Sequence, residues 1–322
     1  MRSLRLAYSD FWPGFDPGSH RLLRLLGQRR GVVLGSFEDA DVLVYSDYGE
    51  RHWGFQGPKV YLTAENMLPD FDQCDLAFGP DGPKDDARFV RYPYFAQALP
   101  LLGSLVRGPG HDPSAFMGRD GFCAFVASNP RAPERNRFFR MLRRRRPVES
   151  GGKHFNTTGR RVPDKLSFLR GFRFNLAFEN TRSPGYVTEK LVEPLLVGCI
   201  PIYWGAPDVH EVFNPGCMID VSAYPTLEDA VEGVLRVDDD PAARLRLLST
   251  PPFRNNQPPE CLSDDYLVGP VLRWLDSGPR PGQRRYRHRR LREHVYGSAW
   301  HQTRVSLACR LDGLLWRMGW RR

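Results

Sequence analysis

The segment from Glu179 to Lys190, ENTRSPGYVTEK, combines carboxylate, amide, hydroxyl and ammonium side chains that together can bind an anion. A helix amino terminus offers unpaired N–H groups and a partial positive charge, and Lys190 would add a full charge in the first turn of a helix beginning near Thr188. A lysine at that end opposes the helix dipole unless an anion is present. This position favours a phosphate ligand, with a solvated lysine as the alternative.

Two apolar runs flank this segment and predict the elements that position it. Residues 174–178 have the length and aromatic content of a buried strand, and residues 200–203 are a second strand candidate. Between them, apolar residues recur at helical spacing from Thr188 until Gly198. Polar groups therefore gather at the carboxyl end of a strand, where open α/β sheets bind their ligands.

The motifs of this region resemble those of the inverting α-1,3/4-fucosyltransferases, which transfer fucose from GDP-fucose. The donor-site signature of that family is Phe-Glu-Asn, then Ser or Thr, and after a few residues Tyr, Val or Ile, Thr-Glu-Lys. Residues 178–181 and 186–190 match it, and IPIYWGAPDV at residues 200–209 is also characteristic. The resemblance covers roughly residues 40–220 and has three motifs in order.

The resemblance implies a set of site residues. Residues 125–139, FVASNPRAPERNRFF, resemble the segment that carries a phosphate-binding arginine, which would be Arg135. Residues 61–81, beginning YLTAEN, resemble the acceptor-side segment whose glutamate is the proposed base, which would be Glu65. Lys190 would bind the diphosphate together with Arg135. The predicted substrate-binding residues are Glu179, Asn180, Tyr186, Thr188 and Glu189, with Glu189 on the ribose and Asn180 and Tyr186 lining the nucleotide pocket.

The chemistry of glycosyl transfer requires residues of these types. Its transition state has oxocarbenium character, so a carboxylate must take the acceptor proton and cations must stabilise the departing diphosphate. Glu65, Arg135 and Lys190 could supply these groups. Without the family pattern, Glu65 would be a surface carboxylate in a turn-rich stretch and Arg135 part of a solvated basic helix face. For Glu179, a helper role and a plain polar position at a strand end both stay open.

No metal and no cofactor are expected. Asp-x-Asp triplets, which bind a divalent cation in glycosyltransferases of another fold, occur at residues 39–41, 70–72 and 238–240. The first leads into a strand candidate, the second lies in the acceptor-side segment, and the third precedes Pro241 as a helix start. Residues 151–153, Gly-Gly-Lys, lack the spacing of a P-loop.

Alternating strand and helix signals over 322 residues predict an α/β protein with two Rossmann-like domains and parallel sheets, the GT-B type that the resemblance implies. We assign residues 1–110 to an acceptor-side domain and residues 120–279 to a GDP-fucose-binding domain, with a linker rich in glycine and proline near residues 99–119. In the first domain, strands are predicted at residues 4–9, 31–34, 42–46 and 59–63, with a helix at residues 21–30.

Residues 280–322 form a basic tail. They contain 12 of the 46 Lys and Arg residues and 2 of the 37 Asp and Glu residues, which accounts for the formal net charge of +9. Leucines at helical spacing from residue 307 and three tryptophans predict an amphipathic helix that suits an anionic membrane surface. Packing of this helix on the catalytic body is the alternative. Nucleic-acid binding ranks third, because no recognised binding module accompanies the basic run.

Cysteine spacing and the amino terminus bear on location. The six cysteines form no CxxC pair, so reduced thiols are expected. The amino terminus has too short an apolar core for a signal peptide, and no apolar run reaches the roughly 18 residues of a membrane span. Animal relatives in the Golgi carry an amino-terminal membrane anchor, and the sequence predicts no such anchor here. We therefore expect a bacterial cytoplasmic enzyme that is peripheral to the inner membrane, with lipid-linked or lipopolysaccharide glycans as acceptors.

The predicted function is metal-independent fucosyl transfer from GDP-fucose, with inversion, to the N-acetylglucosamine of a lactosamine-type oligosaccharide. An α-1,3 linkage is favoured and α-1,4 stays open. Two alternatives remain. One is a GT-B enzyme that uses another nucleotide sugar, and the other is an inactive glycan- or membrane-binding protein that kept the fold.

Overall fold

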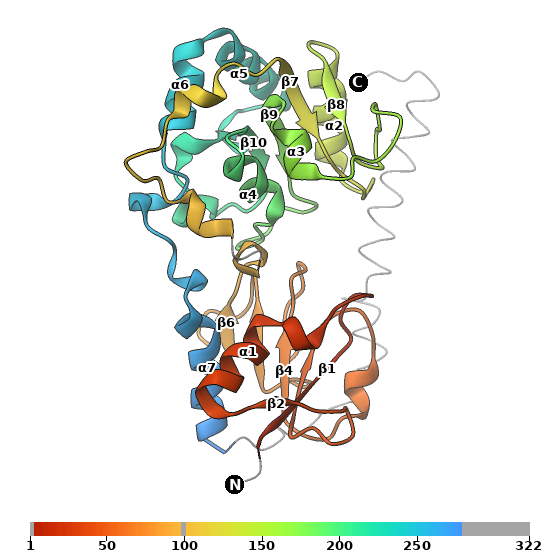
Figure 1. Cartoon of the computed structure of the whole chain (residues 1–322). Coiled ribbons are helices and arrows are strands. Elements are labelled where there is room, and N and C mark those ends of the chain that lie inside the picture. Colours follow the sequence, from red (N-terminus) through yellow and green to blue (C-terminus); the bar gives the residue numbers. More distant parts are fainter. Residues whose placement is uncertain (1–2, 98–100, 279–322) are drawn as a thin grey trace, which may run out of the picture. The chain divides into compact units, whose positions relative to one another are not determined.

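A computed structural model of the protein describes residues 3–97 and 101–278 (Figure 1). Within these residues the chain forms two compact units. The first unit comprises residues 3–97, 183–186 and 259–278, and the second comprises residues 101–182 and 187–258. Each unit has a parallel sheet and a hydrophobic core of its own.

The first unit is built on a six-stranded parallel sheet with the strand order β2-β1-β3-β4-β5-β6. Its strands are β1 (Arg5–Ser9), β2 (Val33–Leu34), β3 (Val42–Tyr45), β4 (Lys59–Leu62), β5 (Leu76–Gly79) and β6 (Phe89–Arg91). The four strands predicted in this part of the sequence are confirmed as β1 to β4. Strands β3 and β4 are buried at every position, as expected for a parallel sheet that is covered on both faces.

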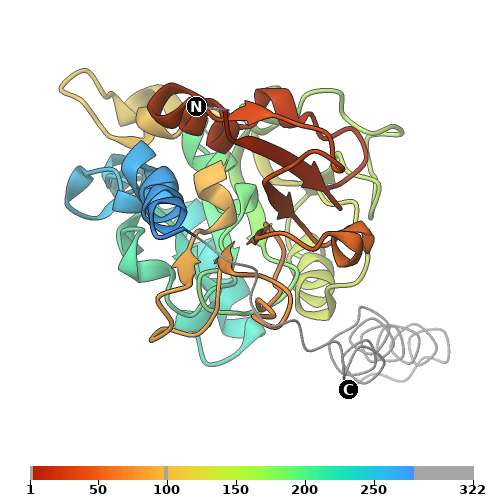
Figure 2. The same cartoon turned by 90° about the horizontal axis from the view of Figure 1, so that it is seen from below.

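Two helices far apart in the sequence pack together in this unit. The predicted helix at residues 21–30 is confirmed as α1 (Arg21–Arg30), and α7 (Asp264–Asp276) lies beside it (Figures 1 and 2). Leucines of α1 share one core cluster with Leu267 and Val271 of α7 and with the strands. Arg21 donates from Nε to Oδ1 of Asp264 at 3.0 Å.

The position of α7 corrects the predicted domain boundaries. Residues 120–279 were assigned to the donor domain, but residues 259–278 belong to the first unit because the apolar face of α7 packs on α1 and the sheet. The linker predicted near residues 99–119 is not a separate segment. Residues 101–119 belong to the second unit, where Leu102 and Leu105 are fully buried.

The second unit is built on a five-stranded parallel sheet with the strand order β11-β10-β9-β7-β8. Its strands are β7 (Gly121–Phe125), β8 (Val148–Ser150), β9 (Phe172–Phe178), β10 (Ile200–Trp204) and β11 (Ile219–Asp220). Its helices are α2 (Pro133–Arg143), α3 (Lys165–Leu169), α4 (Glu189–Leu196), α5 (Leu227–Asp239) and α6 (Pro241–Ser249). The predicted strands at residues 174–178 and 200–203, and the helix after Thr188, are confirmed as β9, β10 and α4.

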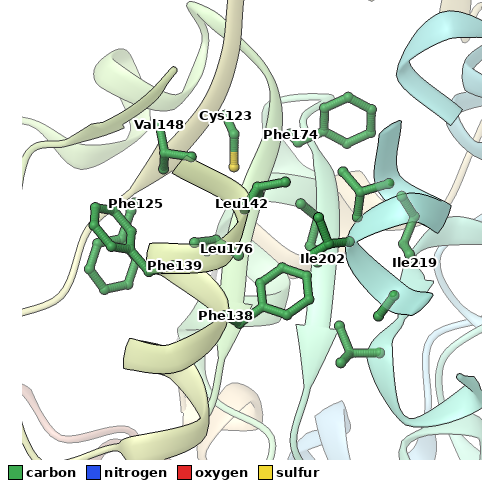
Figure 3. Packing of buried hydrophobic residues seen from close by; sticks show 14 of the residues in the cluster. Cys123, Phe125, Phe138, Phe139, Leu142, Val148, Phe174, Leu176, Ile202 and Ile219 are labelled. Atoms are coloured by element: carbon green, nitrogen blue, oxygen red, sulfur yellow. The ribbon is translucent and has the colours of Figure 1, made fainter. Parts of the chain in front are cut away.

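Helices cover both faces of this sheet. On one face, Phe174 and Leu176 of β9 pack in a large cluster with Phe138 of α2 and with apolar residues of α5 (Figure 3). On the other face, a smaller cluster contains Leu169 of α3 and Cys199, which precedes β10. This layering of helix, parallel sheet and helix confirms the predicted α/β class.

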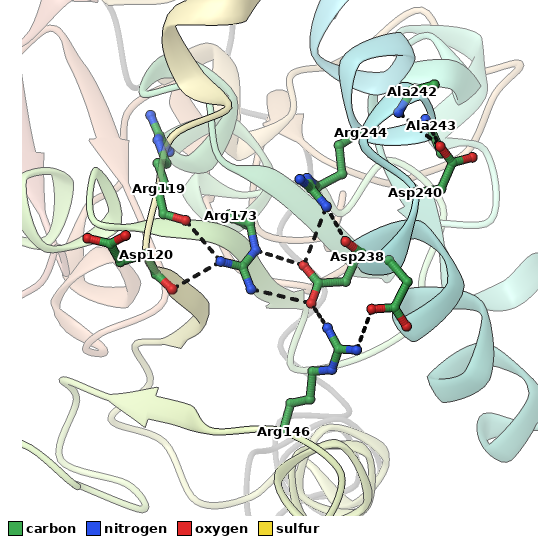
Figure 4. A network of polar contacts seen from close by, with 10 residues as sticks. Arg119, Asp120, Arg146, Arg173, Asp238, Asp240, Ala242, Ala243 and Arg244 are labelled. Carbon is green, nitrogen blue, oxygen red and sulfur yellow. Dashed lines mark hydrogen bonds and ion pairs between the residues drawn. The ribbon is translucent and has the colours of Figure 1, made fainter.

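A buried aspartate ties several elements of the second unit together (Figure 4). The Asp238 side chain, near the end of α5, is 1% exposed and accepts hydrogen bonds from Arg146 and Arg173. The Arg173 Nε to Oδ1 distance is 2.7 Å, and Arg244 of α6 donates to the backbone carbonyl of Asp238. The carboxylate therefore links α5 to β9 and to the segment after α2, and charge pairing offsets the cost of its burial.

Among the described residues no helix is long and apolar enough to cross a membrane. The five cysteines that lie in the described ranges are free, and four of them are buried. The basic tail at residues 280–322 lies outside the described residues.

Candidate functional site

The carboxyl edge of the second sheet brings two helix amino termini together. Strands β7 and β9 are neighbours and parallel, so they end at the same edge. Helix α2 follows β7 and begins at Pro133, and helix α4 follows β9 and begins at Glu189. The positive ends of two helix dipoles therefore meet at this edge, which favours an anion.

Glu179 organises the start of α4. Its side chain is fully buried directly after β9, and Oε1 accepts a hydrogen bond from the Thr188 backbone N–H at 2.8 Å. Oε2 accepts from the Thr188 hydroxyl at 2.8 Å and from Lys190 Nζ at 3.2 Å. Thr188 is also the N-cap of α4, since its hydroxyl accepts from the Lys190 N–H. Glu179 is thus more than a polar residue at a strand end, because it fixes both the helix cap and the lysine.

The charges around Lys190 keep it protonated. Burial lowers the pKa of Lys190, but the carboxylates of Glu179 and Glu189 raise it by more, so its pKa lies above the ordinary value. Burial raises the pKa of Glu189, but Lys190 and Lys165 lower it by more, so this side chain is a carboxylate at neutral pH. The two carboxylates also compensate the lysine at the positive end of the dipole. These carboxylates therefore explain why a lysine is tolerated at the start of the helix. The position of Lys190 does not by itself indicate a bound phosphate.

A glycine makes the burial of Glu179 possible. A Cβ atom on Gly205, directly after β10, would lie 2.6 Å from Cγ of Glu179 and 2.4 Å from the hydroxyl oxygen of Tyr203. Both contacts are closer than side chains tolerate. The glycine in the motif IPIYWGAPDV is therefore required by the packing around Glu179.

Arg135 is buried at the amino terminus of α2. It is 1% exposed, donates from Nη1 to Oδ1 of Asn180 at 3.0 Å, and donates from Nη2 to the carbonyl of Asn129. The alternative of a solvated basic helix face is wrong for this residue, although Arg143 at the other end of α2 is exposed. The charge of Arg135 lowers the pKa of Lys190, so the two cations are close enough to repel each other.

His154 and its neighbours are part of this edge, and the sequence analysis missed them. His154 Nε2 lies 2.8 Å from Oδ1 of Asn136, whose amide nitrogen donates to the Pro130 carbonyl. This amide orientation assigns the proton to Nε2. Burial, and then the charges of Arg135 and Arg140, lower the pKa of His154 to about 4. The imidazole is therefore neutral at neutral pH.

The sequence signal for this loop was the glycine pair of residues 151–153, which lack the spacing of a P-loop. In the structure, a Cβ atom on Gly152 would lie 2.2 Å from the backbone oxygen of Ala127. The glycine lets the loop after β8 run close to the loop after β7, and the His154 N–H donates to the same carbonyl at 2.9 Å. Its role is close backbone packing beside α2.

In the first unit, Glu65 lies in a hydrogen-bonded network after β4. The Tyr48 hydroxyl donates to Oε1 of Glu65 at 2.9 Å, and the Glu65 N–H donates to the Thr63 hydroxyl at 3.0 Å. The hydroxyls of Thr63 and Tyr61 donate in turn to the two carboxylate oxygens of Asp47. Glu65 is half-buried, and both its carboxylate and its backbone N–H are hydrogen-bonded, unlike those of a free surface residue.

Asp47 and Tyr48 were not predicted as site residues. Burial, and to a smaller extent the charge of Glu65, raise the pKa of Asp47, while the hydroxyls of Thr63 and Tyr61 oppose this shift. Both residues follow β3, which is the parallel neighbour of β4. The sequence does show polar residues directly after β3 and after β4. Only the strand order shows that β3 and β4 are neighbours, which brings these polar residues together.

The predicted site residues divide between the two units. Glu179, Asn180, Thr188, Glu189 and Lys190 lie in the second unit with Arg135, and Glu65 lies in the first. Tyr186 is buried and belongs with residues 183–185 to the first unit. Gly185 has a φ of +67°, and a Cβ atom there would lie 2.0 Å from the Pro80 carbonyl oxygen. Only glycine fits this point of the loop between β9 and α4.

The aspartate triplets have structural partners. Asp240 is the N-cap of α6, as predicted, and accepts from the N–H groups of Ala242 and Ala243. Asp238 lies in the arginine network described above. Within the described ranges, no group of three or more His, Cys, Asp or Glu side chains could hold a metal ion.

One parallel-sheet α/β unit has a buried arginine and a partly buried lysine at helix amino termini, and the other has a half-buried carboxylate. Two such units are the parts of a GT-B glycosyltransferase. The comparisons with known proteins give the family. The Alpha-(1,3)-fucosyltransferase FucT N-terminal domain matches residues 6–97, and the carboxyl-terminal domain of glycosyltransferase family 10 (fucosyltransferase) matches residues 117–249. The chain belongs to this fucosyltransferase family.

Individual relatives agree with this assignment. Alpha-(1,3)-fucosyltransferase FucT of Helicobacter pylori is 33% identical over 268 residues, which are 71% of this chain and 56% of the relative. An alpha-(1,4)-fucosyltransferase of Arabidopsis thaliana is 42% identical over 72 residues, 22% of this chain and 18% of the relative. A crystal structure of an alpha1,3-fucosyltransferase with GDP-fucose matches at a TM-score of 0.72 and 27% identity, covering 87% of this chain and 92% of that one. The chain thus spans little more than half the length of its Helicobacter relative.

Proposed function

We propose that this protein is an inverting fucosyltransferase that transfers L-fucose from GDP-fucose to a glycan hydroxyl. The observation that carries the proposal is the pair of cations, Arg135 and Lys190, at the amino termini of α2 and α4 on one sheet edge. The match to a fucosyltransferase structure with GDP-fucose supports this choice of donor.

In the proposed reaction, Arg135 and Lys190 bind the donor diphosphate. The guanidinium group suits two phosphate oxygens at once, and the ammonium group acts as a compact charge. As the bond between fucose C1 and the β-phosphate oxygen breaks, the electron pair leaves with GDP, and these cations with the helix dipoles stabilise the added charge. We propose that this arrangement makes a divalent metal unnecessary.

The acceptor proton goes to Glu65 in this proposal. The acceptor hydroxyl oxygen attacks C1 from the face opposite GDP, so the configuration inverts, and the carboxylate of Glu65 accepts the proton. Tyr48 donates to Oε1 of Glu65, so Oε2 is the oxygen assigned to this role. On the donor side, Asn180, Tyr186 and Glu189 are proposed to contact the nucleotide, while Glu179 and Thr188 hold Lys190.

The proposed acceptor is the N-acetylglucosamine of a lactosamine-type glycan. The α-1,3 linkage follows the Helicobacter relative, and the shorter match to an alpha-(1,4)-fucosyltransferase keeps α-1,4 as the second linkage to assay. We place the reaction in bacterial surface-glycan or lipopolysaccharide synthesis on the cytoplasmic side of the inner membrane. The basic tail at residues 280–322 would contact anionic lipid there.

The deciding experiment measures thermal stabilisation of the purified protein by GDP, GDP-fucose, GDP-mannose and UDP-galactose, with and without EDTA. A ligand that binds the folded state raises the midpoint by mass action, by about 2.7 kcal/mol of stability at a hundredfold excess over Kd. We expect a shift with GDP and GDP-fucose that survives EDTA. A shift only with UDP-galactose, or only with metal present, would refute the proposed donor site.

Product analysis completes the test. GDP-fucose and N-acetyllactosamine would be incubated with the protein, and the linkage and anomeric configuration of the product would be read by NMR. Binding of glycan without turnover would instead support an inactive glycan-binding protein.

A further inference from the structure

Two exposed aromatic rings lie next to each other in the first unit. Tyr48 is 50% exposed and Trp12 is 39% exposed, and their ring centroids are 6.3 Å apart at an interplanar angle of 75°. Trp12 follows β1 and Tyr48 follows β3, which are neighbouring parallel strands. Both rings thus come from the carboxyl edge of this sheet, where α/β proteins bind ligands.

The Trp12 ring packs against other aromatic rings of the first unit. Phe15 meets it edge-on at 5.0 Å, and Phe11 stacks on Phe15 at 4.0 Å with an interplanar angle of 15°. Phe11 and Tyr8 pack against the core of the unit. Trp12 is therefore held in a defined orientation while part of its surface stays open to solvent.

The Tyr48 ring is tied to the proposed base. Its hydroxyl donates to Oε1 of Glu65 at 2.9 Å, so a single hydrogen bond links the ring to the carboxylate. Single exposed apolar residues are common on protein surfaces and need no explanation. A tryptophan and a tyrosine in contact, with the tyrosine bonded to Glu65, are a more specific arrangement.

We propose that Trp12 and Tyr48 form an aromatic platform for the pyranose ring of the acceptor sugar, an inference that builds on the proposed function. Because the two rings meet at 75°, the sugar would stack on the face of one ring and touch the edge of the other. One face of a pyranose presents C–H groups whose slightly positive hydrogens match the negative face of an aromatic ring. Burial of that face also removes apolar area from water. The equatorial hydroxyls at the rim of the sugar remain free to approach Glu65.

The experiment measures acceptor KM and donor affinity separately in variants of the full chain. For Trp12→Ala and Tyr48→Ala we expect the KM for N-acetyllactosamine to rise roughly tenfold, the loss of one aromatic contact. The Kd for GDP-fucose, measured by calorimetry, should stay within about twofold. Trp12→Phe keeps a ring and should give an intermediate KM, and thermal unfolding reports whether each variant is folded.

Two further variants sharpen the test. Tyr48→Phe keeps the ring but loses the bond to Glu65, so its KM should stay near the wild-type value while kcat falls. Leu34→Ala is the matched control, because Leu34 is 47% exposed in the same unit but pairs with Leu6, in the amino-terminal half of β1. It should change neither KM nor kcat.

Wild-type acceptor KM in folded Trp12→Ala and Tyr48→Ala would overturn the platform. A titration of N-acetyllactosamine followed by saturation-transfer NMR adds a readout that needs no turnover, and the Kd should rise roughly tenfold in both alanine variants. If the wild-type protein failed to bind GDP-fucose, the proposed function would fall, while the NMR result would still decide the platform.

Discussion

Lys190 is the residue at which charge, burial and proposed function meet most closely. Its ammonium group lies 3.2 Å from Oε2 of Glu179 and 3.6 Å from Oε1 of Glu189. The carboxylates hold the cation in place before any ligand binds, so little side-chain entropy would be lost on binding a diphosphate. Arg135 is held in the same manner by Asn180 and Asn129.

For Lys190→Ala we expect GDP affinity and turnover to fall together, by tenfold or more for the loss of a charge-assisted contact of about 1.5–3 kcal/mol. Stability should fall as well, because Glu179 would stay buried without its cation. The double variant Glu179→Gln, Lys190→Ala should regain stability but not GDP affinity. Lys84→Ala, an exposed lysine of the first unit, is the control. Unaltered GDP affinity in Lys190→Ala would remove it from the donor site.

For Glu65→Gln we expect intact GDP binding and a loss of transfer of about 10²–10⁴-fold, because an amide cannot accept the acceptor proton. Calorimetry with GDP and a product assay separate the two effects. Glu38→Gln is the matched control in the same unit, since the Glu38 side chain is 71% exposed and pairs with Arg51. Transfer at the wild-type rate would show that another group is the base.

At the scale of elements, the second unit depends on contacts between helix ends. The amino termini of α2 and α4 carry the proposed donor site, whereas the end of α5 carries the Asp238 network. Arg146 and Arg173 reach this carboxylate from the segment after α2 and from β9. The network thus fixes the helices against the sheet that positions the site.

The variant Asp238→Asn should destabilise the second unit by about 3 kcal/mol, because its arginines would keep their charge beside a neutral and buried amide. Urea unfolding followed by circular dichroism gives this number. The neighbouring change Asp239→Asn is the control, since the Asp239 side chain is 65% exposed and its pair with Arg146 should contribute less than about 1 kcal/mol. Equal effects of the two changes would show that burial of Asp238 is unimportant.

At the scale of the whole molecule, each unit contains a histidine that burial keeps neutral. Burial lowers the pKa of His20 in the first unit to about 4, and burial with two arginine charges does the same for His154 in the second. In the unfolded chain both would titrate near the ordinary value of about 6.5. Between these values the unfolded state binds more protons than the native state.

Both units should therefore lose stability as the pH falls from about 6.5 to about 4. For His20 the loss can reach about 3 kcal/mol, and for the less buried His154 it should be smaller. Urea midpoints measured across this range test the prediction. The double variant His20→Phe, His154→Gln should show a flatter pH dependence, and a slope equal to that of the wild type would contradict the assignment.

Much of the local structure followed from the sequence. The helix at residues 21–30 and the strands β1 to β4, β9 and β10 agree with the predictions to within about two residues, because apolar spacing and glycine stops act over a few neighbouring positions. The fucosyltransferase motifs supplied the candidate residues from Glu65 to Lys190. They did not supply the partners of these residues.

The sequence by itself determined several of the elements, the polar strand ends and the family, since each of these depends on a short stretch of chain. Only the tertiary structure decided that α7 packs on α1, that Glu179 pairs with Lys190, and that Asp47 and Tyr48 support Glu65. The physical reason is that these contacts depend on strand order and on the packing of helices on sheets. Strand order and helix packing depend on how apolar surface is buried across the whole chain, and a local sequence pattern does not contain this information.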